Sequence, residues 1–195
     1  MIPILILAAG QSSRMRGKDK LLMDVGGQPL LARQIEMASG IGHVFAAISP
    51  DQTTRMEVAE SCGASVLTVH AADEGIGGTL RNAVPLLPSV GTFMVLLSDL
   101  ICIETKDLLG LVDSSHEHVD HLIWRGATAD GAAGHPIIFD DQLRPLFASL
   151  RGDRGANAIV AQHAQQTYLH RFTDNRARYD LDTPEDWDAW RQAQK

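Results

Sequence analysis

The feature that most constrains the fold is a repeated alternation of short apolar runs with segments that place apolar residues at helical spacing. The first run, Ile2–Leu7, is too short for a membrane span or a signal peptide, and it predicts a strand buried on both faces. Alternation of this kind predicts an α/β domain. We expect further strands at 44–48, 65–69, 93–97, 121–124, 136–139 and 167–171, and helices at 29–39, 53–62, 79–87, 105–116, 143–150, 156–163 and from 184 onward.

The whole chain, 1–195, is predicted to form one domain. The sequence shows no internal repeat, low-complexity tract or linker, and its hydrophobic fraction of 45% is typical of a globular protein. Pro136 begins one of the expected strands, and proline is tolerated at an edge or in an antiparallel strand more readily than in a central one. We therefore expect 136–139 to be an edge or antiparallel strand.

The net charge of −7 argues against nucleic acid as a partner, because binding DNA or RNA calls for a broad basic face. A local basic cluster can still attract an anionic small molecule. The two cysteines, Cys62 and Cys102, show neither metal-ligand spacing nor a disulfide framework, which favours a reducing cytoplasm. No apolar run suggests a membrane partner. The basic cluster comprises Arg14, Arg16, Lys18 and Lys20.

The segment after the first strand has the composition of a phosphate-binding loop. Small residues let the backbone approach a ligand, and exposed N–H groups and hydroxyls can donate to phosphate oxygens. Arg14 and Lys20 supply the positive charge that a triphosphate requires. The loop matches neither a Walker A motif nor a dinucleotide fingerprint. Its expected nucleotide-binding residues are Leu7, Ala8, Ala9, Gly10, Ser12, Ser13, Arg14 and Lys20.

The run Leu7-Ala8-Ala9-Gly10-Gln11-Ser12-Ser13-Arg14-Met15, followed by Lys20-Leu21-Leu22, resembles the N-terminal signature of nucleotidyltransferases with a glycosyltransferase-A-like fold. Within that superfamily the chain looks most like the cytidylyltransferase branch of the molybdenum cofactor nucleotidyltransferases. The resemblance implies a three-layer, Rossmann-like fold whose sheet is mostly parallel with one antiparallel strand. Ala9 favours CTP, because guanylyl-transferring relatives tend to carry a second glycine at that position.

Asp99 follows the strongly apolar run 93–97, and ligands of open α/β sheets bind at the carboxyl ends of such strands. A carboxylate there suits Mg²⁺, although a helix cap or loop carboxylate is an equal alternative. The resemblance implies that Asp99 is catalytic and binds metal, with Ser98 beside it at the nucleotide. The family usually has a proline shortly after this aspartate, whereas Leu100 and Ile101 stand here.

The segment Asp180-Leu181-Asp182-Thr183-Pro184-Glu185-Asp186 carries two overlapping signals. Thr183, Pro184 and Asp186 form a helix-capping pattern and need no other explanation. The family has an aspartate before Thr-Pro that completes the metal site, and the resemblance gives that role to Asp182. A second acidic cap is the competing interpretation.

Two further segments resemble family motifs. The glycine-rich stretch 72–80 implies contacts to base and ribose from Asp73, Gly75, Gly78 and Thr79, and a plain turn with a helix cap explains it equally well. Gly134-His135-Pro136 and Gly152-Asp153-Arg154-Gly155 resemble segments that shape the acceptor side, which implies acceptor contacts from His135 and Arg154. Simple turns would account for these two segments as well.

The resemblance as a whole implies Mg²⁺-dependent transfer of a nucleoside monophosphate from an NTP, with CTP favoured, to molybdopterin, releasing pyrophosphate. The product would pass to a molybdoenzyme or its chaperone. One alternative is a nucleotidyltransferase for a sugar 1-phosphate or a phospho-alcohol. Another is a non-catalytic nucleotide-binding module of the same fold.

Overall fold

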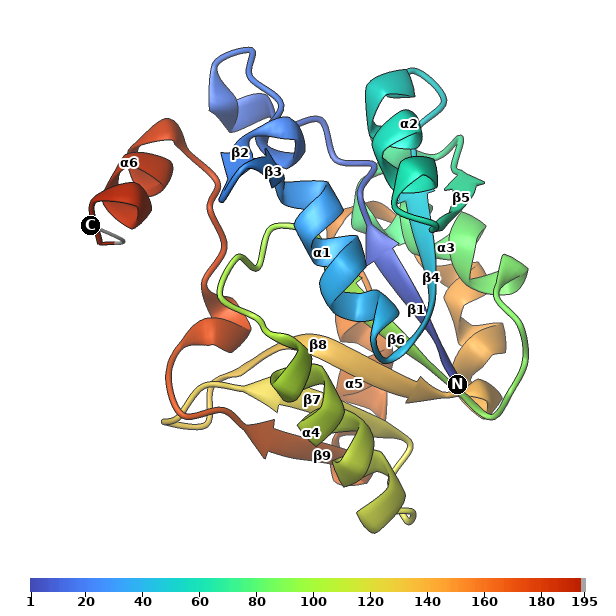
Figure 1. The fold of residues 1–195 in the computed structure, drawn as a ribbon. Coiled ribbons are helices and arrows are strands. Elements are labelled where there is room, and N and C mark those ends of the chain that lie inside the picture. Colours follow the sequence, from blue (N-terminus) through green and yellow to red (C-terminus); the bar gives the residue numbers. More distant parts are fainter. Residues whose placement is uncertain (194–195) are drawn as a thin grey trace.

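A computed structural model of the protein describes residues 1–193 and contains a twisted seven-stranded sheet with the strand order β5-β4-β1-β6-β8-β7-β9 (Figure 1). Neighbouring strands are parallel except at β8, which runs antiparallel to both β6 and β7. The strands are β1 (Ile2–Leu7), β4 (Gly42–Ile48), β5 (Ser65–Thr68), β6 (Thr92–Leu97), β7 (Ile123–Ala127), β8 (Ala133–Asp140) and β9 (Thr167–Arg171), with β2 (Asp24–Val25) and β3 (Gln28–Pro29) forming a separate small hairpin.

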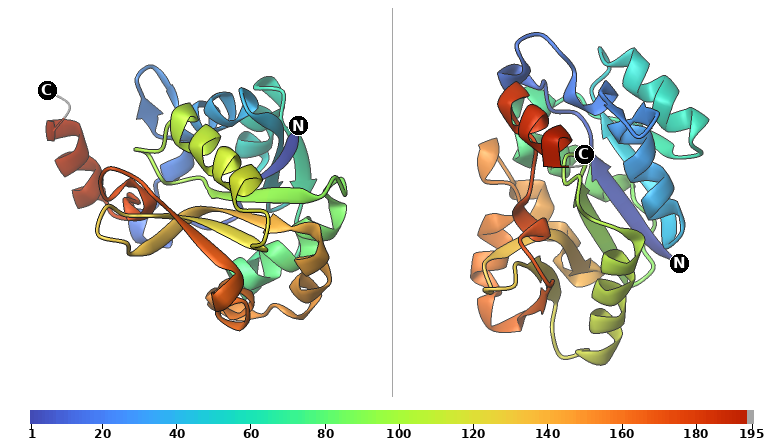
Figure 2. Two further views of the ribbon diagram at one scale, coloured as in Figure 1. Left: turned by 90° about the horizontal axis from the view of Figure 1, so that it is seen from below. Right: turned by 60° about the vertical axis from the view of Figure 1, so that its left-hand side comes forward.

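Helices cover both faces of the sheet, as the two views in Figure 2 show. Alternate residues of β1 point to opposite faces, so that Ile4 and Ile6 join one hydrophobic cluster and Leu5 joins the other. The first cluster includes residues of α1 (Leu30–Ser39), α2 (Thr53–Ser61), α4 (Thr105–Glu117) and α6 (Pro184–Ala193), and the second includes residues of α3 (Ile76–Ala83) and α5 (Asn157–Gln162).

The α/β class and the mostly parallel sheet with one reversed strand are confirmed. The segment expected at 143–150 forms a 3-10 helix, Asp141–Ser149, because Pro145 cannot continue an α-helical hydrogen-bond ladder. Of the two alternatives expected for the strand with Pro136, the antiparallel strand is found and the edge position is not, since β8 lies between β6 and β7 and runs antiparallel to both. The pairing of β7 with β8 shifts register between Arg125 and Ala127, so the hydrogen-bond ladder is interrupted opposite Pro136. Pro136 has no N–H to donate, and the interrupted ladder requires none at that point.

Among the described helices, none combines the length and apolar character that crossing a membrane requires. The carboxyl ends of β1 and β6 lie side by side in the parallel register Leu7–Leu97. The loops that leave these two ends therefore meet above the sheet, where the candidate site is found.

Candidate functional site

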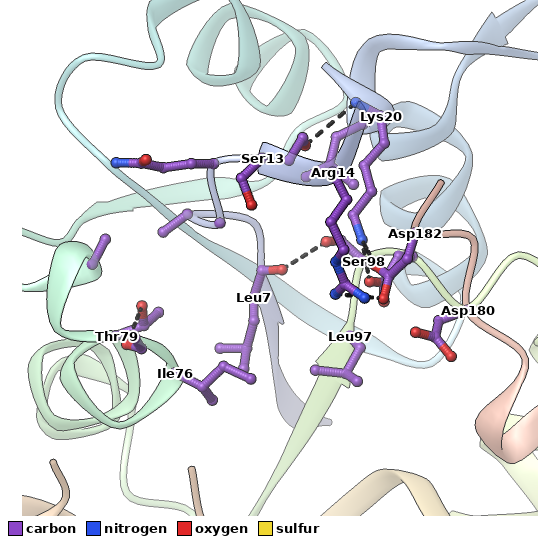
Figure 3. A pocket seen from close by; sticks show the side chains of 18 of the residues that line it. Leu7, Ser13, Arg14, Lys20, Ile76, Thr79, Leu97, Ser98, Asp180 and Asp182 are labelled. Carbon is purple, nitrogen blue, oxygen red and sulfur yellow. Dashed lines mark hydrogen bonds and ion pairs between the residues drawn. The ribbon is translucent and has the colours of Figure 1, made fainter. Parts of the chain in front are cut away.

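A cavity of about 700 Å³ opens at the carboxyl ends of β1 and β6, with the loop after β1 on one side and the start of α3 on another (Figure 3). Most of the expected nucleotide-binding residues line it, together with the two expected metal ligands. The lining residues are Leu7, Ala9, Gly10, Gln11, Ser12, Ser13, Arg14, Lys20, Leu21, Ala72, Asp73, Gly75, Ile76, Thr79, Leu97, Ser98, Asp99, Asp153, Asp180 and Asp182.

The loop after β1 offers a row of backbone donors to this cavity. Within residues 1–193, the N–H groups of Ala9, Gly10, Gln11 and Ser12 donate to no other group. Ser12 adopts a left-handed conformation with φ 50°, which bends the loop around the cavity. Consecutive free N–H groups in such a bend form a concave site for anions. The hydroxyl of Ser98 donates to the carbonyl of Leu7 (2.7 Å) and ties β6 to this loop.

The opposite wall is the N-terminal turn of α3. Gly75 has φ +86°, and a Cβ at this position would collide with the carboxylate of Asp153. Thr79 is buried and lines the cavity. Gly78 faces away from the cavity lining, since its missing side chain makes room for the backbone of Ala71. Glycine is needed at both positions for close packing between segments.

Beneath the loop, Lys20 joins two carboxylates from distant parts of the chain. Its Nζ lies 2.6 Å from Oδ2 of Asp99 and 2.7 Å from Oδ1 of Asp182. Burial works to lower the pKa of Lys20, but the two carboxylates outweigh burial and raise it above its usual value. Arg14 Nη2 lies 2.6 Å from Oδ2 of Asp182, so this carboxylate meets a cation at each oxygen.

A third carboxylate, Asp180, belongs to the same group. Ligand oxygens of Asp99, Asp180 and Asp182 lie within 4.8 Å of one another. Burial, together with the negative charge of Asp182 and Asp99, raises the pKa of Asp180. Burial acts in the same direction on Asp182, but hydrogen bonding from Lys20 lowers the pKa of Asp182 overall. Asp182 therefore holds its negative charge more readily than Asp180 does.

This group of carboxylates fits a divalent cation. Asp99 Oδ1 is buried and has no hydrogen-bond partner in the described chain, which leaves an acceptor oxygen available beside the lysine. Carboxylate oxygens are the ligands that Mg²⁺ prefers, and a phosphate bound by the neighbouring loop N–H groups would supply further oxygen ligands to that ion. A lone acidic cap would not require the second and third carboxylates.

Four expected site residues are not among those that line the cavity. Ala8 is buried, and its N–H donates to the Ala47 carbonyl (2.9 Å). Gly78 packs against Ala71 as described above. His135 lies on β8, where burial and then the charge of Arg125 lower its pKa to about 4, so its ring is neutral at pH 7. Arg154 lies one residue beyond Asp153, which does line the cavity.

The helix-capping signal at the start of α6 is confirmed. The N–H of Thr183 donates to Oδ2 of Asp186 (2.8 Å), and the N–H of Asp186 donates to the hydroxyl of Thr183 (3.2 Å). This reciprocal pair fixes the chain just after Asp182 and so helps to hold that carboxylate at the cavity.

Two residues that contribute to the site were not among the residues expected from the sequence. Asp180 stands in the same short acidic segment as Asp182, and that spacing is a signal that could have included it. Arg55 on α2 binds the loop from behind, and no motif marks it, because arginine on a helix is usually a solvent-exposed residue.

Comparisons with known proteins identify the family of the chain. A family model described as a MobA-like NTP transferase domain matches residues 4–167. Bifunctional protein GlmU of Neisseria meningitidis serogroup C is 31% identical over 120 residues, which cover 60% of this chain. The chain spans about a quarter of the length of that relative, since the match covers 26% of it.

Solved structures share the fold. Rv0371c from Mycobacterium tuberculosis H37Rv superposes with a TM-score of 0.84 at 22% identity, covering 98% of both chains, and one similar structure is described as its complex with manganese. A CMP:2-keto-3-deoxy-manno-octonic acid synthetase complexed with CTP has a TM-score of 0.75 at 15% identity, covering 100% of this chain and 98% of the other.

Proposed function

Because this chain belongs to the family of MobA-like NTP transferase domains, we propose that it moves a nucleoside monophosphate from a nucleoside triphosphate to a phosphorylated acceptor, releasing pyrophosphate. One observation carries the proposal: a single cavity joins a loop of free N–H groups to two cations and three carboxylates. Phosphoryl chemistry needs alignment and charge neutralisation more than it needs a protein nucleophile, and these residues offer both.

In the proposed reaction, an oxygen of the acceptor phosphate attacks the α-phosphorus of the nucleotide. The bond from that phosphorus to the oxygen bridging the α- and β-phosphates breaks, and pyrophosphate leaves with the electron pair. The loop N–H groups bind and orient the triphosphate. Arg14 and Lys20 stabilise negative charge on the triphosphate and on the departing pyrophosphate.

We propose Mg²⁺ as the cofactor, held by Asp99 and Asp182 with Asp180 beside them. When bound, the ion would neutralise charge on the reacting phosphate oxygens. Lys20 pairs with two of these carboxylates, and a bound triphosphate would offer its amino group another partner. The description of a manganese complex for a protein of the same fold supports a divalent cation in general.

We favour CTP as the nucleotide. Ala9 lines the cavity and is 2% exposed, and its methyl group occupies space that a glycine would leave to a larger base. The structural neighbour described as complexed with CTP supports the same choice. Nucleotide contacts are proposed for the expected residues that line the cavity, and Ala8 and Gly78, which do not line it, are left out. The proposed contacts are Leu7, Ala9, Gly10, Ser12, Ser13, Arg14, Lys20, Asp73, Gly75, Thr79 and Ser98.

Molybdopterin is the acceptor that we favour, with His135 and Arg154 as its candidate contacts and a molybdoenzyme or its chaperone as the recipient of the product. The free cysteines Cys62 and Cys102 support the cytoplasm as the compartment. A sugar-derived or phospho-alcohol acceptor is the second candidate, because the CTP-bound neighbour is described as a synthetase for a sugar-acid nucleotide.

Equilibrium binding by calorimetry in the presence of Mg²⁺ tests the nucleotide part of this proposal. We expect CTP to bind more tightly than GTP or ATP. A preference for GTP would move the chain to the guanylyl-transferring branch, and binding of none of the three would overturn the proposal.

Two arginines offer a matched pair of variants for the same measurement. Arg14 lines the cavity, whereas Arg16 pairs with Glu185 at the exposed surface (2.5 Å). Each substitution, Arg14→Met or Arg16→Met, removes one positive charge from the same loop. We expect Arg14→Met to weaken CTP binding about ten-fold, the cost of one charge-assisted hydrogen bond, and Arg16→Met to leave it nearly unchanged. Equal losses of CTP affinity in the two variants would show that binding depends on the overall charge of the loop, and would contradict a specific role for Arg14.

A further inference from the structure

Arg55 stands out as a charged side chain that is almost completely buried. It lies on α2, its exposure is 2%, and it does not line the cavity. A guanidinium removed from water is costly unless its donors and its charge are satisfied. The loop that follows β1 provides the partners for both the donors and the charge of Arg55.

All five N–H donors of the Arg55 guanidinium have acceptors, and every acceptor belongs to the segment 8–19. Nε and Nη2 donate to Oδ2 and Oδ1 of Asp19, both at 2.7 Å. Nη1 donates to the carbonyls of Ala8 (2.6 Å) and Gly10 (2.7 Å), and Nη2 also donates to the hydroxyl of Ser12 (3.3 Å). One planar group thus joins the beginning of the loop to its end.

The first consequence concerns the direction of the backbone. Because the carbonyls of Ala8 and Gly10 are bound to Arg55, the oxygens of this part of the loop face α2. Ser12 has a left-handed backbone conformation, which is unfavourable for most residues other than glycine. The hydrogen bond from Arg55 to the Ser12 hydroxyl helps to hold this conformation. The free N–H groups between Ala9 and Ser12 are then left to line an anion site.

The second consequence concerns Lys20. Asp19, held by two bonds from Arg55, also accepts from the N–H of Leu21 (3.0 Å), so it caps the short helix that begins at Lys20. The N–H of Lys20 itself is 3.4 Å from the Ser12 hydroxyl. The position of the lysine backbone therefore depends on the same two side chains that Arg55 binds.

We infer that Arg55 is a positioning residue that presets the triphosphate site: it fixes the loop N–H groups and Lys20 relative to each other without touching the substrate. Its charge is balanced by Asp19, so it acts through geometry and adds no net charge to the site. The inference rests on the proposed function for the identity of the ligand, a nucleoside triphosphate. Its structural part, the order of the segment 8–20, is independent of that ligand.

Arg55→Lys tests the inference, because lysine keeps the charge but lacks the five-donor fork. Arg144→Lys is the matched control: Arg144 is also largely buried, and it binds the carbonyls of Val84 (2.6 Å) and Leu87 (3.0 Å) and the carboxylate of Asp141. None of these four residues lines the cavity. The readouts are the dissociation constants for CTP and CMP with Mg²⁺ and the amide hydrogen exchange of segment 8–20.

For Arg55→Lys we expect the dissociation constant for CTP to rise about ten-fold and that for CMP by less than about three-fold. The lost bonds orient the loop N–H groups that are proposed to bind the β- and γ-phosphates, and CMP lacks both phosphates. Exchange in segment 8–20 should become faster, while Arg144→Lys leaves both readouts as in the wild type. Equal losses for CTP and CMP, or unchanged exchange in the segment, would overturn the inference. A wild-type protein that binds no nucleotide would overturn the proposed function instead, and the exchange comparison would still decide the role of Arg55.

Chemical rescue gives a second measurement that a general loss of stability would not reproduce. Arg55→Ala leaves a space bordered by the Asp19 carboxylate and the two carbonyls, and free guanidinium ion has the donors to occupy it. We expect millimolar guanidinium to restore CTP binding in Arg55→Ala and to have no such effect on Arg144→Ala. Absence of rescue in a folded Arg55→Ala protein would contradict a role that depends on the guanidinium alone.

Discussion

The Nζ atom of Lys20 lies 2.6 Å from Oδ2 of Asp99, so an amino group of the protein occupies the space beside the strand-end carboxylate. The same amino group lies 2.7 Å from Asp182, and both carboxylates belong to the group of three that suits a divalent cation. A metal ion bound by these carboxylates would therefore compete with the positive charge of Lys20 for them. This competition links metal binding to the arrival of a triphosphate, which offers Lys20 another partner.

Removing the amino group should strengthen metal binding in the absence of nucleotide. We expect Lys20→Met to raise the affinity for Mn²⁺ by about ten-fold or more, since one competing charge pair is worth upward of 1 kcal/mol in a partly buried site. Electron paramagnetic resonance of free Mn²⁺ measures this directly, with Arg16→Met as the control for overall charge. Unchanged or weaker affinity in Lys20→Met would contradict the competition.

The same substitution should have the opposite effect on the nucleotide. Lys20 is proposed to bind the phosphates, so Lys20→Met should weaken CTP far more than cytidine. Parallel titrations of the two ligands under identical Mg²⁺ concentrations provide the comparison. An equal loss for CTP and cytidine would mean that the lysine supports the cavity in general.

Asp99→Ala should abolish transfer and leave the fold intact. The residue follows the end of β6, and the contacts of its carboxylate are a pair with Lys20 through Oδ2 and none through Oδ1 in the described chain, so the variant loses one ion pair at the cavity and no core packing. Circular dichroism checks the fold, and pyrophosphate release checks the activity. Full activity of this variant at limiting Mg²⁺ would remove Asp99 from the mechanism.

His135 gives a prediction about pH. Burial lowers its pKa to about 4 in the folded protein, whereas an unfolded chain has a histidine pKa near its ordinary value of 6.5. Between these values the unfolded state binds the proton and the folded state does not. The stabilising contribution of neutral His135 is therefore complete above pH 6.5 and declines as the pH falls toward 4, by at most about 1.4 kcal/mol per pH unit.

Urea denaturation of the wild type and of His135→Gln at pH 7 and pH 4.5 measures this contribution. The wild type should lose more free energy of unfolding than the variant over that interval. Equal losses would show that His135 titrates alike in both states.

The seven-stranded sheet could be predicted because its strands carry hydrophobic signals of their own, whereas the short strands β2 and β3 were not expected. The run Ile2–Leu7 has the same bounds in the sequence pattern and in β1, and the strand 167–171 is equally well defined. The position of β8 could not be predicted in this way. Whether Pro136 lies at an edge depends on the register of a neighbouring strand and its irregularity at Arg125, and neither is encoded locally.

The site residues also differ in whether a local sequence signal marks them. Asp99 and Asp182 stand next to recognisable strand and capping signals, so each could be found in the sequence, but their meeting through Lys20 is a property of the fold. The loop after Asp99 illustrates the difference. Without the family proline, Leu100 is buried and its carbonyl accepts from Gln34 Nε2 (3.2 Å), a contact across 66 positions that no local pattern announces.

The activity proposed for this cavity is transfer of a nucleoside monophosphate with CTP as the donor. The decisive measurement is pyrophosphate release in the presence of Mg²⁺ and metal-loaded molybdopterin, compared for CTP, GTP and ATP. We expect turnover with CTP and little with the other two nucleotides. Absence of pyrophosphate release with all three, from a protein that still binds CTP, would contradict molybdopterin as the acceptor and leave a different phosphorylated acceptor or a nucleotide-binding module without transferase activity.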